Sequence, residues 1–190
     1  MTAVSRLLIF SGGISAAEVA AVVAGGVAGD ALEGDVEVAD GYKSFREVIL
    51  HSGGVVVAAL KDSETILLVK QYRYPLKQTV LELPAGKLEI GENPDEACKR
   101  ELEEETGYRA KNWKSLGYIN TTPGICTEKL YLYLASDLEF VGEHPDEGEI
   151  IKCFEFKLSE VFQMINDGTI NDAKTICALS RAFCGGFTHD

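Results

Sequence analysis

Apolar and polar positions divide the chain into short segments that predict both strands and helices. Residues 46–51, 54–60 and 65–71 are rich in Val, Ile and Leu, and such short apolar runs between turn-forming residues are typical of β-strands. The turn sequence KDSE separates the last two runs, so we expect them to form a hairpin. Further along the chain, the pattern predicts strands at 114–119, 129–135 and 150–156.

Three later segments carry helix signals. The most polar of them runs from Pro94 to Thr106, where Asn93 can cap the N-terminus, proline suits the first helical position and Gly107 suits a left-handed terminal residue. Two more helices are predicted near the C-terminus: 158–167, ended by Gly168, and 172–183, capped by Asn171.

Residues 1–40 are rich in Ala, Val and Gly but show no clear period, and a turn signal at Asp40-Gly41 ends them. We therefore expect an N-terminal arm of strands over residues 1–45, which could serve dimerisation, and one larger domain over 46–190. Strands mixed with a few helices, without an internal repeat, predict an α/β (α+β) fold with a mixed sheet packed between helices.

The net charge of the chain argues against some classes of binding partner. A net charge of −12 over 190 residues repels nucleic acid phosphates and anionic lipids, so we expect neither nucleic acid nor membrane binding. A phosphorylated substrate would need cations as mediators. The five cysteines are odd in number and lack a Cys-x-x-Cys spacing, so we interpret them as buried apolar residues of a cytoplasmic protein.

The polar helix concentrates carboxylates on one face. Residues three and four apart lie on the same side of a helix, so Glu101, Glu104 and Glu105 point in one direction. Three such carboxylates repel one another without a counterion. Clusters of carboxylate oxygens with water and substrate phosphate are what Mg²⁺ prefers, and we therefore expect Mg²⁺ here, with Mn²⁺ as an alternative ion.

The spacing around this helix resembles the Nudix box. Gly86 and Glu92 are separated by five residues, seven residues follow, and then comes the run Arg100-Glu101-Leu102-x-Glu104-Glu105-x-Gly107. The next residue departs from the pattern, because Tyr108 stands where the family usually has an aliphatic residue. The resemblance implies a Nudix α/β/α sandwich with a mixed sheet between helices.

The resemblance also implies roles for the box residues. Glu101 and Glu105 would bind metal, Glu104 would bind metal or activate water, and the backbone carbonyl of Ala85 would add a ligand. Hydrogen bonds between Glu92 and Arg100 would lock the loop to the helix. The residues expected to act structurally are Gly86, Glu92, Arg100 and Gly107.

Flanking segments are similar to the ADP-ribose pyrophosphatase branch of that family. The box is entered through LELPAG, and Pro123 lies sixteen residues after Gly107, where the branch has a proline. The resemblance makes Arg46 and Arg73 candidates for the phosphates or adenine of the substrate, and it places Glu128, in the PGICTE loop, beside the substrate. A surface salt bridge stays the alternative for each arginine.

A second acidic stretch, residues 144–152, resembles the mobile loop of the same branch. There Glu147 matches the general base and Glu149 a further metal ligand. Glu104 is the alternative base, and the Pro-Asp-Glu-Gly sequence is also a good turn.

The resemblance implies Mg²⁺-dependent hydrolysis of the pyrophosphate bond of ADP-ribose or a related nucleoside diphosphate sugar, giving AMP and ribose 5-phosphate. The alternatives are a Nudix hydrolase of a GDP-sugar, dinucleoside polyphosphate or nucleoside triphosphate, and a Nudix-like module that binds a nucleotide sugar without cutting it. The branch commonly forms homodimers through N-terminal strands, so we expect a homodimer built with residues 1–50.

Overall fold

The computed structural model describes residues 7–8, 31–37, 43–142 and 151–183. The chain divides into two compact units, each described here by itself. One comprises residues 1–52 with 122–128, and the other comprises residues 53–121 with 129–190.

The smaller unit is built on a three-stranded sheet. β1 (Leu7–Leu8) runs parallel to β2 (Ala31–Glu37), which pairs antiparallel with β3 (Lys43–Ile49). The strand predicted over 46–51 is therefore present as β3. The 122–128 segment joins this unit through two backbone hydrogen bonds to Ile49. The Ile49 N–H donates to the Ile125 carbonyl at 2.7 Å, and the Ile49 carbonyl accepts from Thr127 N–H at 2.9 Å.

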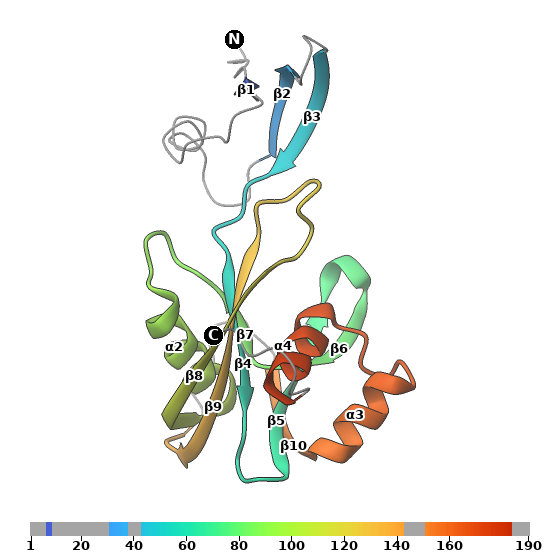
Figure 1. The fold of residues 1–190 in the computed structure, drawn as a ribbon. Coiled ribbons are helices and arrows are strands. Elements are labelled where there is room, and N and C mark those ends of the chain that lie inside the picture. Colours follow the sequence, from blue (N-terminus) through green and yellow to red (C-terminus); the bar gives the residue numbers. More distant parts are fainter. Residues whose placement is uncertain (1–6, 9–30, 38–42, 143–150, 184–190) are drawn as a thin grey trace. The chain divides into compact units, whose positions relative to one another are not determined.

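The larger unit has a central mixed sheet in the order β7-β4-β9-β8 (Figure 1). β4 (Gly54–Ala59) is buried along its whole length, as expected for a strand covered on both faces. It runs antiparallel to β7 (Ala85–Lys87) and parallel to β9 (Lys129–Phe140), and β9 runs antiparallel to β8 (Tyr108–Asn120).

The predicted hairpin is wrong. β5 (Thr65–Arg73) belongs to a second sheet, between β10 (Ile151–Lys157) and β6 (Gln78–Glu82), and meets the β4 segment only at the isolated bridge Leu60–Ile66. The reason is that β7 and β9 already occupy both edges of β4, so β5 finds its partners elsewhere. A 3-10 turn, Tyr74–Leu76, connects β5 to β6.

Helices cover the two faces of the central sheet. α2 (Pro94–Thr106) packs Ala97 and Leu102 against Val55 and Val57, whereas α4 (Ala173–Phe183) packs on the side of Val56 and Ala58, and α3 (Leu158–Asn166) joins α4 there (Figure 1). Alternate residues of β4 point to opposite faces, so one strand serves both cores. The predicted mixed sheet between helices is confirmed. Among the described helices, none has the length and apolar character needed to cross a bilayer.

The limits of α2 agree with the predicted ones. The Asn93 side chain accepts a hydrogen bond from Asp95 N–H at 2.9 Å, and Gly107, at φ 73°, donates its N–H to the Glu103 carbonyl. The cap predicted for α4 is wrong by one residue. The Asp172 side chain, not that of Asn171, accepts from Thr175 N–H at 3.0 Å.

The cysteine prediction holds only for Cys98, because Cys126, Cys153 and Cys177 are partly exposed and Cys184 lies outside the described residues. Burial raises the pKa of the Cys98 thiol to about 12, so it stays protonated at neutral pH. Cys98 is therefore a packing residue on the buried face of α2.

The cap of α2 gives a stability prediction. Replacing Asn93 with Ala removes the acceptor for Asp95 N–H, and we expect the free energy of unfolding to fall by about 1 kcal/mol in urea titrations. Asn93→Asp keeps an acceptor at the same place and should lose far less. Equal stability of the Asn93→Ala variant and the wild type would show that the helix start does not depend on this cap.

Candidate active site

The candidate site lies where β7 leads through a tight loop into α2. β7 is held against β4 by the pairing of Gly86 with Val55, and the loop returns the chain to the helix start at Pro94. This connection brings the predicted metal ligands of β7 and α2 onto neighbouring elements.

Gly86 makes room for a carboxylate. A Cβ atom at Gly86 would lie 1.8 Å from Cδ of Glu101, which is far inside contact distance. Glu101 is only 9% exposed, so its carboxylate is seated directly on the backbone of β7. Any larger residue at position 86 would displace the Glu101 carboxylate, which explains why this position is a glycine.

Arg100 holds the loop and the helix together. Its Nε donates to Oε1 of Glu92 and its Nη2 to Oε2 of Glu92, both at 3.0 Å, which is the bidentate pair that the resemblance implies. Its Nη1 donates to Glu101 at 2.9 Å and to Glu104 at 2.8 Å. One guanidinium therefore compensates three carboxylates.

These contacts change the ionisation of the pair. Hydrogen bonds from Arg100 hold the pKa of the Glu92 carboxyl below its usual range, and the same bonds to Glu92 raise the pKa of Arg100. The loop is consequently fixed by charges that persist across the neutral pH range.

Glu105 is tied to the residue before Gly86. Its Oε2 accepts a hydrogen bond from Ala85 N–H at 2.9 Å. Glu101 and Glu105, one helical turn apart, thus both face the Ala85-Gly86 segment. The predicted ligands Ala85, Glu101 and Glu105 are brought together, and Glu104 joins them through Arg100.

The residues present fit a hard divalent cation. They offer carboxylate and carbonyl oxygens, and Mg²⁺ commonly takes one or two carboxylates and completes its shell with water and substrate phosphate. In the described part of the chain, no three His, Cys, Asp or Glu side chains form a ready-made metal cluster.

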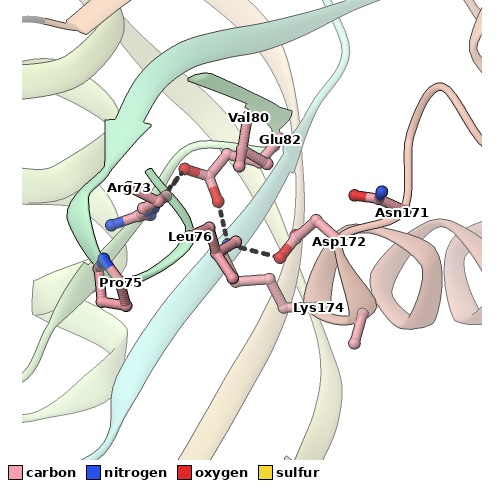
Figure 2. Close-up of a pocket in the computed structure, with 9 residues that line it drawn as sticks. Arg73, Pro75, Leu76, Val80, Glu82, Asn171, Asp172 and Lys174 are labelled. Carbon is pink, nitrogen blue, oxygen red and sulfur yellow. Dashed lines mark hydrogen bonds and ion pairs between the residues drawn. The ribbon is translucent and has the colours of Figure 1, made fainter. Parts of the chain in front are cut away.

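A second charged cluster lies at the end of β6, and its central residue, Glu82, was not among the residues predicted from the sequence. Figure 2 shows Glu82 between Arg73 and Lys174, with Lys174 also reaching Asp172. Nε and Nη2 of Arg73 lie 2.8 and 2.7 Å from Oε1 of Glu82. The signal was a lone acidic residue between Leu81 and Leu83, because a charge inside an apolar strand needs partners.

The other predicted substrate residues divide between the units. Arg73 lies in the larger unit and forms an ion pair, but its partner Glu82 is buried, so this pair is not the surface salt bridge named as the alternative. Arg46, Pro123 and Glu128 lie in the smaller one. Arg46 is exposed and donates to the Phe45 carbonyl at 2.8 Å, and Glu128 lies 3.6 Å from Nε2 of His51. Glu147 and Glu149 lie outside the described residues, so their roles stay predictions.

The NUDIX domain family matches residues 50–179, which is more than half of the chain. The chain therefore belongs to the NUDIX family, as its box predicted.

Individual relatives cover most of the chain. The ADP-ribose pyrophosphatase of Bacillus subtilis (strain 168) is 41% identical over 147 residues, which is 76% of this chain and 80% of the relative. The methanol dehydrogenase activator of Bacillus methanolicus is also 41% identical over 147 residues, with the same two shares. The crystal structure of an ADP compounds hydrolase has a TM-score of 0.71 at 22% identity, covers 80% of this chain and 83% of its own, and shares the fold.

The Arg100–Glu92 pair predicts an acid-dependent loss of stability. Because the folded-state pKa of Glu92 lies below its ordinary value near 4.5, the contribution is complete above that pH and disappears as the pH falls through the folded-state pKa. The Glu92→Gln variant should therefore be less stable than the wild type at pH 7, by about 1–2 kcal/mol in urea titrations.

The difference should shrink below pH 4.5, where the wild-type carboxylate also protonates. Glu96→Gln is the matched control, because Glu96 pairs with Lys99 on the exposed side of the same helix and should change little. A difference that stayed constant from pH 7 to pH 3 would contradict the charged pair.

Proposed function

We propose that the protein hydrolyses the pyrophosphate bond of ADP-ribose, or of a related nucleoside diphosphate sugar, to AMP and ribose 5-phosphate. The observation that carries the proposal is the seating of Glu101 and Glu105 against the Ala85-Gly86 segment, with Arg100 locking the loop. The 41% identity to an ADP-ribose pyrophosphatase supports the substrate class.

The proposed cofactor is Mg²⁺, which Mn²⁺ could replace. Glu101, Glu105 and the Ala85 carbonyl would hold it. When bound, the ion would neutralise the diphosphate and lower the pKa of a water nucleophile. An acidic chain needs such a cation before it can hold a pyrophosphate.

The residues of the chain divide the remaining tasks. Arg100 keeps the helix and loop in register, while Arg73 and Arg46 are proposed to bind the phosphates or adenine. Glu147 or Glu104 would take the proton of the attacking water. Glu104 already accepts a hydrogen bond from Arg100, whereas Glu147 lies outside the described residues, so both stay candidates.

Two alternatives differ in class. Hydrolysis of a GDP-sugar, a dinucleoside polyphosphate or a triphosphate would use the same box with a different substrate pocket. A module that binds without cutting is disfavoured, because such a domain is expected to lose box carboxylates and all of them are present here. We further propose a cytoplasmic homodimer in which the N-terminal strands contribute to the partner's site.

A substrate panel tests the proposal. We expect the highest kcat/KM on ADP-ribose when ADP-ribose, ADP-glucose, GDP-mannose, a diadenosine polyphosphate and ATP are compared at one Mg²⁺ concentration. The products should be AMP and ribose 5-phosphate, identified by chromatography. A clear preference for ATP or the diadenosine compound, or release of inorganic pyrophosphate, would refute the substrate assignment and leave the Nudix chemistry standing.

The metal ligands are tested by substitution on one helix. Glu105→Gln should lower kcat by about two orders of magnitude or more at saturating Mg²⁺, with an unchanged circular dichroism spectrum, because a ligand is lost but the shape is kept. Glu103→Gln is the matched control, since Glu103 lies on the same helix, pairs with Arg109 of β8 at 2.7 Å and has no role in the site. Wild-type turnover in Glu105→Gln would remove this residue from the ligand set.

A further inference from the structure

Glu82 is a buried carboxylate outside the box. It is 1% exposed and lies between two cations, Arg73 on β5 and Lys174 in the first turn of α4 (Figure 2). Burying a carboxylate costs several kcal/mol unless it is paired and hydrogen-bonded. Both oxygens are paired here, Oε1 with Arg73 and Oε2 with Lys174.

The cluster closes into a ring of hydrogen bonds. Nζ of Lys174 lies 3.0 Å from Oδ1 of Asp172, and Oδ2 of Asp172 accepts from the Thr175 hydroxyl at 2.6 Å. The Thr175 hydroxyl oxygen in turn accepts from Leu83 N–H at 2.9 Å, and Leu83 is the residue after Glu82. The ring therefore joins the end of β6 to the start of α4 at two adjacent residues.

The charges of this ring balance. Arg73 and Lys174 contribute two positive charges, and Glu82 and Asp172 contribute two negative ones. The buried Glu82 side chain therefore lies in a cluster whose formal charges sum to zero. Lys174 contacts Oε2 of Glu82 and so fixes the orientation of the carboxylate, which leaves Oε1 to pair with Arg73.

Arg73 differs from the other members in its exposure. Its side chain is 35% exposed and lines a pocket of about 310 Å³ together with residues from the 3-10 turn and the start of α4 (Figure 2). Glu82 contacts the guanidinium through Nε and Nη2, which is one edge of the fork. An arginine has five N–H donors, so contact along one edge orients the rest of the group toward the pocket.

We propose that Glu82 and Lys174 are positioning residues for Arg73, which they hold in the orientation that binds the diphosphate of the substrate. The inference rests on the proposed function, because it requires a diphosphate to reach Arg73. Through Leu83 the same ring also holds the short connection between β6 and β7, and β7 begins at Ala85, only three residues after Glu82. The ring therefore fixes the position of Arg73 relative to the Ala85-Gly86 segment.

A double-mutant cycle tests the positioning role. KM and kcat are measured for the wild type, Glu82→Gln, Arg73→Ala and the double variant, on whichever nucleotide sugar the wild type cleaves fastest. We expect Glu82→Gln to raise KM about tenfold or more and to change kcat little, because an arginine without its charged partner loses orientation. In the Arg73→Ala background the same substitution should change KM less than about twofold, because no arginine is left to orient.

Lys174 supplies a second test if Glu82→Gln does not fold. Lys174→Met should raise KM severalfold, and Lys174→Arg should restore most of the affinity by keeping a cation beside Glu82. Arg181→Gln is the matched control on α4, since Arg181 donates to the carbonyls of Leu116 and Tyr118 at the other end of the helix. It should lower the melting temperature without changing KM.

Two results would overturn the inference. One is an unchanged KM in both Glu82→Gln and Lys174→Met, and the other is an equal effect of Glu82→Gln with and without Arg73. A wild type that prefers another nucleotide sugar over ADP-ribose contradicts the substrate assignment instead, and the cycle is then read on that preferred substrate.

Discussion

The candidate site depends on the hydrogen bonds of Arg100. Glu101, Glu104 and Glu105 lie on one side of the helix, so their negative charges repel one another. The Arg100 guanidinium reduces this repulsion, because it donates hydrogen bonds to Glu101 and Glu104 and also to Glu92. Because Arg100 and Glu92 are also the two ends of the connection between loop and helix, the same interaction that compensates charge sets the geometry of the loop. Loss of the Arg100 hydrogen bonds would therefore change both the charge balance of the site and the conformation of the loop.

The rest of the larger unit supports that arrangement. β4 is buried on both faces and gives β7 a fixed edge, and β7 gives Glu101 its seat at Gly86. α2 covers one face of the central sheet and α4 covers the other, so the box lies on one side and the Glu82 cluster faces the start of α4. The two clusters are connected along the chain by the short segment from Glu82 to Gly86.

The sequence predicted the limits of single elements well, but it did not predict which strands pair or which distant residues come into contact. The limits of α2 follow from Asn93, Pro94 and Gly107, whose effects act within one helical turn. The Glu92–Arg100 pair was predicted from the resemblance of this segment to the Nudix box, and the structure contains it. The hairpin failed because strand pairing depends on which edges other segments already occupy, and no local pattern records that. The Glu82–Lys174 contact joins residues 92 positions apart, so only the fold could reveal it.

We expect the box carboxylates, which contact the Ala85-Gly86 segment of β7, to form a divalent metal site. The most direct measurement is Mn²⁺ binding followed by electron paramagnetic resonance in the wild type and in Gly86→Ala, whose added Cβ would occupy the place of the Glu101 carboxylate. Mn²⁺ should bind Gly86→Ala about tenfold or more weakly than the wild type, while the circular dichroism spectrum stays unchanged. Identical Mn²⁺ binding curves for the two proteins would contradict it.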